Sequence, residues 1–177
     1  MPRLFLTGGR GMVGQNVRAH HLAQGWEVLA PSSTELDLTE SKKVCAYIKM
    51  HKPDLVIHAA GRVGGIQANI AHPVDFLDIN TVIGRNVIMG AWVEGVRDLI
   101  NLGSACMYPE HNQLDPDNPD CREESAYPAA PDSEYGWEKL FSERLFFAYS
   151  RNYGIPVRVA RYHNIFGPEG TWEGGRE

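Results

Sequence analysis

The sequence predicts an α/β protein built on a doubly wound parallel sheet of the Rossmann type. Short apolar runs alternate with stretches of helical periodicity along the chain, and a glycine-rich turn directly follows the first apolar run. Alternation of this kind favours a parallel sheet covered on both faces, and right-handed crossovers then favour double winding. The 177 residues, 43% of them hydrophobic, are enough for a single packed domain.

The first half of the chain is expected to supply three strands and two helices. Residues 3–7 (RLFLT) form an apolar run that ends at glycines, and residues 12–23 follow with apolar side chains near helical spacing. Residues 26–30 (WEVLA) predict a second strand, which a proline stops. Residues 41–51 have the i, i+4 spacing of a helix, and residues 55–58 (LVIH) predict a third strand.

The second half is expected to add two helices and two strands. Apolar spacing predicts a long helix over residues 78–94, and residues 98–102 (DLINL) predict a fourth strand. A helix over residues 133–153 has a serine as its expected N-cap, and residues 156–161 (PVRVAR) predict a fifth strand. Five prolines among many polar residues between positions 109 and 131 predict a long surface loop, which in a compact domain is usually functional or disordered.

Composition argues against several classes of protein. The chain has 17 basic and 22 acidic residues and no basic run, which disfavours binding to nucleic acid or to an anionic membrane. No apolar stretch approaches the roughly 18 residues that a membrane span needs. The three cysteines form no CxxC pair and indicate reduced thiols in a cytoplasm. His20 and His21 are adjacent, a poor arrangement for chelation, and we predict no metal site.

A glycine motif predicts a phosphate-binding turn. Residues 7–14 read TGGRGMVG, with Gly8, Gly11 and Gly14 spaced three apart between a predicted strand and a predicted helix. Glycine lets the backbone turn sharply and approach a pyrophosphate, while the helix N-terminus offers unpaired N–H groups. We therefore predict a dinucleotide site here, although an ordinary tight turn between strand and helix would show the same glycines.

The end of the second predicted strand bears on the choice of cofactor. An acidic residue there would hold the ribose hydroxyls of NAD, but residues 30–33 read APSS. Arg10, within the glycine turn, is suited to pair with the 2′-phosphate of NADP. The expected cofactor is therefore NAD or NADP, with a lean towards NADP. Asp37 and Leu38 are placed to touch the adenine, and a solvated loop explains them equally well.

Tyr135 and Lys139 predict the chemistry. They are four residues apart in a predicted helix and therefore share one face. A lysine ammonium favours the charged form of a nearby phenol, which then takes a proton from a sugar hydroxyl as hydride leaves the same carbon. Ser104 follows the fourth predicted strand at its carboxyl end, where open parallel sheets bind ligands. A lone Tyr-x-x-x-Lys often arises by chance, so the motif indicates a catalytic site only together with the glycine turn and this serine.

The glycine turn, Ser104 and the Tyr-x-x-x-Lys spacing together resemble the extended short-chain dehydrogenase/reductase superfamily, and within it the NAD-dependent epimerase/dehydratase family. Residues 62–80 (RVGGIQANIAHPVDFLDIN) look like GDP-fucose synthases. The stretches LGSACMYPE, EYGWEKL and RYHNIFGPEGTWEGGRE, ending at residues 110, 140 and 177, look like GDP-mannose 3,5-epimerases. The resemblance implies an enzyme that acts on a GDP-hexose through a transient 4-ketone with a recycled NAD(P).

Two alternatives remain open. One is a GDP-4-keto-6-deoxymannose 3,5-epimerase-4-reductase, which would consume NADPH. The other is a non-catalytic dinucleotide-binding module. The resemblance also implies that residues 1–161 form the dinucleotide-binding domain, that residues 162–177 begin a substrate lobe largely missing from this chain, and that the helices over 78–94 and 133–153 pair in a homodimer. Simple core packing would explain about half of the apolar residues of the second helix.

The resemblance gives Cys106 the role of moving a proton at a carbon beside the ketone, whereas a buried, inert thiol is the ordinary fate of a free cysteine. We expect Ser104 and Cys106 to face one side, since alternate residues of a strand do so. The resemblance also implies a second group, an acid that returns the proton, but this partner of Cys106 is missing. Glu169 stands where GDP-fucose synthases have a histidine, and the lysine of the epimerases would follow Glu177. Cys45 and Cys121 lie in no motif of these families, and we assign them no catalytic role.

With the residues that the resemblance adds, two sets of contacts are predicted. The cofactor contacts are Gly8, Arg10, Gly11, Met12, Val13, Gly14, Asp37, Leu38, Ala59, Ala60, Asn80, Tyr135 and Lys139. The substrate contacts are Gly64, Gly65, Ser104, Cys106, Met107, His163 and Asn164, where His163 is equally well explained as an ordinary packed histidine. The catalytic residues are Ser104, Cys106, Tyr135 and Lys139.

Overall fold

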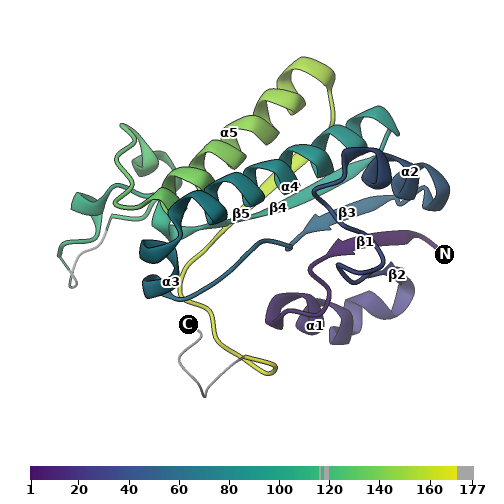
Figure 1. The fold of residues 1–177 in the computed structure, drawn as a ribbon, viewed down its shortest axis with the longest axis horizontal. Helices are drawn as coiled ribbons and strands as arrows, with labels where there is room; N and C mark the ends of the chain where they lie inside the picture. Colours follow the sequence, from purple (N-terminus) through teal and green to yellow (C-terminus); the bar gives the residue numbers. More distant parts are fainter. Residues whose placement is uncertain (116, 118–119, 171–177) are drawn as a thin grey trace.

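The computed structural model, which describes residues 1–115, 117 and 120–170, confirms the doubly wound parallel sheet (Figure 1). Its strands are β1 (Arg3–Thr7), β2 (Glu27–Leu29), β3 (Leu55–His58), β4 (Asp98–Ser104) and β5 (Val157–Tyr162). All neighbouring pairs run parallel, in the order β2-β1-β3-β4-β5. The chain passes from β1 to β2 on one side and then returns to β3 on the other. Ligands bind at such a switch point, beyond the carboxyl ends of the strands.

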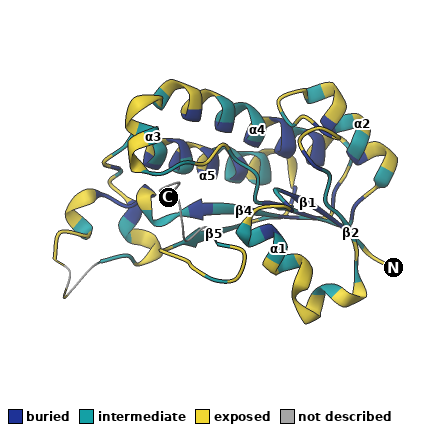
Figure 2. Cartoon of the chain, turned by 60° about the horizontal axis from the view of Figure 1, so that its bottom comes forward, coloured by how far each residue is buried: buried dark blue, intermediate teal, exposed yellow. Residues whose placement is uncertain are grey.

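Helices cover the two faces of this sheet unequally. The helices α2 (Ser41–His51), α4 (Pro73–Val93) and α5 (Glu134–Tyr153) lie on one face, with α4 in contact with both of the others (Figures 1 and 2). The helix α1 (Met12–Ala19) lies on the opposite face (Figure 2). The short helix α3 (Ile66–Ala71) precedes α4 and was not expected from the sequence.

Two helix boundaries differ from the prediction. The expected helix over residues 12–23 ends at Ala19, because His20 is extended, and a 3-10 turn η1 (His21–Gly25) follows. The helix expected from residue 78 begins five residues earlier, at Pro73. Proline is well suited to a first helical turn, where its missing N–H would have no partner in the helix.

The long loop between residues 109 and 131 contains short 3-10 turns. They are η3 (Glu110–Asn112) and η4 (Glu123–Ala126), and a further turn, η2 (Ala105–Met107), directly follows β4. The loop is held by side-chain bonds: Asn112 donates to the Ser125 carbonyl at 2.7 Å, and Arg161 to the Glu123 carbonyl at 2.7 Å. The described part of this loop is therefore fixed to itself and to β5.

The hydrophobic core lies between the sheet and the helices α2, α4 and α5. Alternate residues of a strand face opposite sides, so β3 and β4 alternate between buried and half-buried positions. The residues that face the three helices are the buried ones, and the centre of the core is formed by Phe5, Val44, Ile48, Val56, Val87, Ile88, Leu99 and Phe146. Burial of each such side chain contributes about 1.5–3 kcal/mol.

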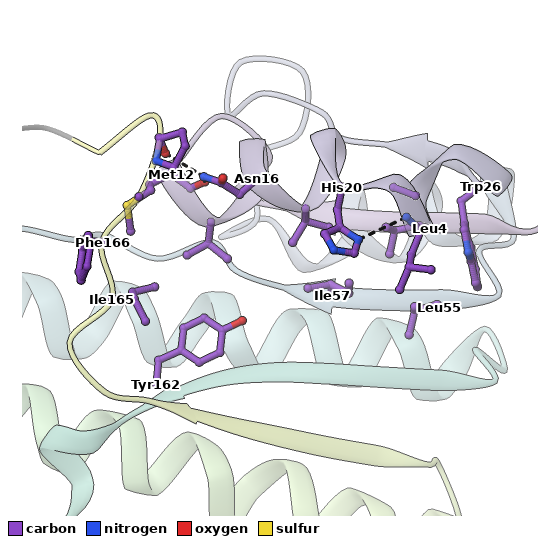
Figure 3. Close-up of a pocket in the computed structure, with 16 residues that line it drawn as sticks. Leu4, Met12, Asn16, His20, Trp26, Leu55, Ile57, Tyr162, Ile165 and Phe166 are labelled. Carbon is purple, nitrogen blue, oxygen red and sulfur yellow. Dashed lines mark hydrogen bonds between the residues drawn. The ribbon is translucent and has the colours of Figure 1, made fainter.

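The opposite face carries an apolar groove of about 540 Å³ (Figure 3). Side chains from α1, β1 and β3 line it, together with the segment that follows β5. Leu55 and Ile57 of β3 face it, and Phe166 is 85% exposed along its edge. This face is incompletely covered by the residues that the structure describes.

Candidate active site

Close packing at the glycine turn requires glycine at two of its positions. Gly8 has a φ of 71°, and a Cβ there would lie 2.6 Å from the Ala59 carbonyl oxygen. A Cβ on Gly14 would collide with the Gly8 carbonyl oxygen, so the helix α1 begins in direct contact with the turn. The Gly11 N–H donates to the Gly8 carbonyl at 3.0 Å. The N-cap of α1 is Gly11, and no side chain caps this end of the helix, which suits the binding of a pyrophosphate.

A cavity of about 450 Å³ lies beside this turn, at the ends of β1, β2 and β3. The structure brings together seven of the predicted cofactor contacts along its wall: Gly8, Arg10, Gly11, Asp37, Leu38, Ala59 and Ala60. Met12 does not line this cavity but faces the apolar groove (Figure 3). Val13 lies between the groove and the neighbouring cavity at the end of β4. We call the 450 Å³ space the cofactor cavity.

Asp37, which lines the cofactor cavity, and Glu35, two residues before it, are carboxylates held by local hydrogen bonds. Glu35 accepts hydrogen bonds from the Ser32 N–H and hydroxyl, each at 2.7 Å, and these bonds lower the pKa of its carboxyl. Asp37 accepts bonds from the Thr39 hydroxyl and N–H, which lower the pKa of Asp37. Arg10 is exposed and lines the same cavity, and its positive charge also lowers the pKa of the Glu35 carboxyl. Glu35 was not predicted as a site residue from the sequence.

Two buried asparagines of α4 fix the walls of this cavity. Asn80 accepts from the Arg62 N–H at 2.6 Å and donates to the Arg62 carbonyl at 3.1 Å, which holds the segment after β3. Asn86 donates to the carbonyls of Leu38 and Thr39, both at 2.9 Å. Asn80 was predicted as a cofactor contact and is seen to hold the backbone. Asn86 was missed, although a polar residue on the apolar face of a predicted helix is a recognisable signal.

Ser104, Tyr135 and Lys139 meet in a second cavity, of about 270 Å³. The Lys139 Nζ lies 5.4 Å from the centroid of the Tyr135 ring, as their shared helix face predicted. Ser104 is the last residue of β4 rather than the residue after it. The predicted N-cap is confirmed, since the Ser133 hydroxyl accepts from the Gly136 N–H at 3.3 Å. We call this space the tyrosine cavity.

Cys106 does not follow the strand geometry expected of it. The chain leaves β4 at Ser104 and turns through η2, so the alternation of a strand does not extend to Cys106 and that argument is wrong. Its N–H donates to the Ser104 hydroxyl at 3.2 Å, and its side chain is exposed rather than buried. A Cβ on Gly136 would collide with the Cys106 carbonyl oxygen, so the start of α5 packs directly on this turn.

A third cavity, of about 500 Å³, opens beyond Ser104 and Tyr135. Five of the predicted substrate contacts line it, namely Gly64, Gly65, Ser104, Cys106 and Asn164. His163 is exposed and lines the tyrosine cavity, whereas the Met107 side chain is fully buried and does not face the site. We call the 500 Å³ space the outer cavity.

The three cavities adjoin one another. The tyrosine cavity shares Ala59 and Ala60 with the cofactor cavity, and it shares Ser104 and Tyr135 with the outer cavity.

Two buried residues that the sequence analysis missed also line the tyrosine cavity. Nδ1 of His58 is hydrogen-bonded to the Thr7 hydroxyl, 2.8 Å away, and that hydroxyl also accepts from the Ala60 N–H at 3.1 Å. Burial, aided by the charge of Lys139, lowers the pKa of His58 to about 3, so its ring is neutral. Glu138 is a further buried residue of this cavity and lies beside Lys139.

Among the described residues, no cluster of three or more potential metal ligands occurs. None of the helices in the described part of the chain is long and apolar enough to cross a membrane.

Comparison with known proteins shows relatives along the whole chain. A GDP-mannose 3,5-epimerase of Arabidopsis thaliana is 43% identical over 191 residues, covering 99% of this chain and 50% of that protein. A GDP-L-fucose synthase of Azorhizobium caulinodans is 51% identical over 107 residues, covering 60% of this chain and 34% of that protein. The chain thus spans about half, or less, of the length of these relatives.

A solved structure has the same fold. MlghC, a GDP-mannoheptose C4 reductase from Campylobacter jejuni with NADP bound, superposes with a TM-score of 0.86 at 24% identity, covering 96% of this chain and 54% of that one. Residues 4–176 match a family described as the NAD dependent epimerase/dehydratase family. The match takes in nearly the entire chain, including the glycine turn and the Tyr135–Lys139 pair, and the chain therefore belongs to that family.

Proposed function

We propose that this chain binds NAD(P) and belongs to an epimerase that inverts centres of a GDP-hexose such as GDP-mannose. The adjoining cavities carry the proposal: a glycine-walled space opens onto the Ser104–Tyr135–Lys139 group, which opens onto a space lined by Cys106. The glycine turn supports a dinucleotide, since any side chain at Gly8 or Gly14 would collide with the backbone. The named relatives that act on GDP-sugars support the substrate class.

The proposed reaction begins at carbon 4 of the sugar. Tyr135, with its phenol next to the Lys139 ammonium, takes the proton of the hydroxyl, and Ser104 holds the same oxygen. NAD(P), held beside the glycine turn at Gly8 and Gly11, would supply the chemistry for removal of hydride from that carbon and for its return. Because the product is a ketone, protons on the flanking carbons become acidic, as their removal gives an enolate.

Cys106 is the proposed base for that removal. Its side chain is exposed in the outer cavity, which also contains Ser104 and Tyr135. A thiolate is a suitable base near neutral pH. A second acid would have to return the proton from the opposite face of the sugar to invert the centre.

A simple experiment tests this function. The protein is incubated with GDP-mannose and a trace of NAD, the sugar is analysed by NMR, and absorbance at 340 nm is followed. An epimerase gives new diastereomers with no lasting change in absorbance, because the hydride returns. Unchanged sugar would contradict the proposal.

A reductase is the second candidate, supported by the exposed Arg10 at the cofactor cavity and by the absence of an acid among residues 30–33. An enzyme of this kind, acting on GDP-4-keto-6-deoxymannose, would oxidise one NADPH per sugar. Steady loss of absorbance at 340 nm with that substrate favours this candidate. A non-catalytic module would bind the dinucleotide without turnover, but such a module has no need of Tyr135.

We also propose that residues 1–161 form the dinucleotide-binding domain and that residues 162–177 begin a substrate lobe. Ile165 and Phe166 support this division, because they already lie along the apolar groove after β5 has ended at Tyr162 (Figure 3). Further chain of such a lobe would be expected to cover the groove.

We also propose that the protein works in the cytoplasm. Its three cysteines are free, as expected of a protein of that compartment.

Homodimerisation is a further part of the proposal. The helices α4 and α5 lie side by side (Figure 1), and both carry exposed apolar side chains. Leu77, Trp137 and Phe141 are 38%, 48% and 50% exposed. A two-fold pairing of these helices would bury them, and light scattering coupled to size exclusion would give the mass of a dimer.

A further inference from the structure

Glu138 is a buried carboxylate at the wall of the tyrosine cavity. Its side chain is 3% exposed and lies one residue from Lys139. One carboxylate oxygen, Oε1, accepts from the Ser142 hydroxyl at 2.9 Å. The other, Oε2, has no hydrogen-bond partner in the described part of the chain and lies 3.4 Å from the Lys139 Nζ. An incompletely bonded buried oxygen is costly and calls for an explanation.

The contact with Lys139 supplies that explanation. The Lys139 side chain is 17% exposed, and an ammonium held so far from water needs a counter-charge. Glu138 is the carboxylate that contacts it. The other ionisable groups around the site are His58, which is neutral, Tyr162 and His163 at the tyrosine cavity, and Arg62, Cys106, Asp132 and Glu134 at the outer one.

We propose that Glu138 is a positioning residue for Lys139. Its carboxylate holds the ammonium in place beside the Tyr135 ring in a largely buried site. An ammonium has three N–H donors, so its contact with Glu138 on one side leaves donors for the ligand and the phenol. The ligand part of this inference rests on the proposed dinucleotide function, whereas the fixing of Lys139 does not.

Glu143, one and a half turns further along α5, shows what a purely structural carboxylate looks like. It is also buried, but both of its oxygens accept from the Arg161 guanidinium, at 2.9 and 2.8 Å. That pair ties α5 to β5. Glu138 instead keeps one oxygen directed at a lysine of the site, which distinguishes the two residues.

The test compares the wild type with Glu138→Gln in a chain labelled with ¹⁵N-lysine. The glutamine keeps the size of the side chain and an acceptor for Ser142, but removes the charge. An ammonium signal of Lys139, assigned through Lys139→Met, should be visible in the wild type because the ion pair slows exchange with water, and should be lost in Glu138→Gln. The dissociation constant for NADPH should rise roughly tenfold, as for one lost hydrogen bond to a charged group.

Glu143→Gln is the matched control, since it removes a buried carboxylate from the same helix. It should lower stability while the Lys139 signal remains. The proposal is overturned if the wild type lacks the signal, if Glu138→Gln retains it, or if Glu143→Gln loses it equally. A wild type that shows the signal but does not bind NADPH contradicts the dinucleotide function and leaves the role of Glu138 standing.

A measurement on the wild type alone decides the matter if Glu138→Gln does not fold. Nuclear Overhauser contacts from the Lys139 ammonium to the Tyr135 ring protons and to the Glu138 methylenes are expected. Their absence would overturn the proposal.

Discussion

At the scale of single residues, the site depends on backbone atoms that approach one another where no side chain fits. Gly14 meets the Gly8 carbonyl oxygen, and Gly8 meets the backbone of Ala59. Backbone atoms held by a sheet cannot rotate away as a flexible side chain can. The geometry at the start of α1 is therefore sensitive to a single methyl group.

Replacement of Gly14 by alanine should therefore disrupt the dinucleotide site. The added Cβ collides with the Gly8 carbonyl, which outweighs the better helix propensity of alanine. We expect a loss of about 1–3 kcal/mol in the free energy of unfolding, and at least tenfold weaker dinucleotide binding, measured by urea titration and calorimetry. Gly25→Ala is the control, because its Cβ would meet nothing within 4 Å. Equal behaviour of the two variants would show that the close approach is unimportant.

The buried His58 predicts a dependence of stability on pH. Its pKa is near 3 in the folded protein, against an ordinary 6.5, so between these pH values the unfolded chain binds the extra proton. Stability is therefore full above pH 6.5 and falls on acidification, by up to about 1.4 kcal/mol for each pH unit. In His58→Asn this contribution is absent. Urea titrations should show that the unfolding free energy falls less between pH 7 and pH 5 in the variant than in the wild type. An equal fall in the two proteins would contradict this role of His58.

The residues found from the sequence were those whose relation is local. Tyr135 and Lys139 share a helix face, and that spacing sufficed to place them together. Cys106 shares the outer cavity with Ser104, but the strand alternation expected to bring them together ends at Ser104, where the chain turns. Residues such as His58 depend on partners 51 positions away in the sequence, and no local pattern reveals such a contact.

At the scale of elements, the packing of α5 against η2 sets the geometry between Tyr135 and Cys106. The N-cap Ser133 starts the helix, and Gly136 lets its first turn touch the carbonyl of Cys106.

The bounds of strands and helices with clear periodicity were predicted from the sequence to within a few residues. The crossover rules predicted a doubly wound sheet but not the order of its strands. The helix α3 was missed because its six residues are too few for a periodic signal.

Gly136→Ala tests this contact between elements. The new Cβ would collide with the Cys106 carbonyl and lie 2.8 Å from the Pro131 Cβ, so α5 or η2 must shift. We expect a loss of about 1–3 kcal/mol in unfolding free energy and a changed rate of alkylation of Cys106 by iodoacetamide. An alkylation rate equal to that of the wild type would mean that the helix does not position the cysteine.

At the scale of the whole molecule, the sheet has one fully packed face and one partly open face (Figure 2). Three helices bury the first, and their own outer surface carries the exposed apolar side chains of α4 and α5. The sequence predicted cover on both faces. Periodicity reports that a side chain is apolar, but not which polypeptide covers it.

The proposed dimer gives a prediction at this scale. Phe141→Glu places a charge on the outer surface of α5, where pairing would bury it, and should convert a dimer to a monomer at micromolar concentration. Met50→Glu is the control, because Met50 is a similarly exposed apolar residue on α2. The mass is read by light scattering after size exclusion. A mass unchanged by Phe141→Glu would exclude α5 from the interface.

Incorporation of deuterium into the sugar tests the account most directly. The protein and its Cys106→Ser variant are incubated with GDP-mannose and NAD in heavy water, and deuterium is located by NMR. We expect deuterium at carbons 3 and 5 with the wild type and none with the variant, while both bind NAD equally. Absence of deuterium with the wild type, or incorporation at an equal rate with the variant, would contradict it.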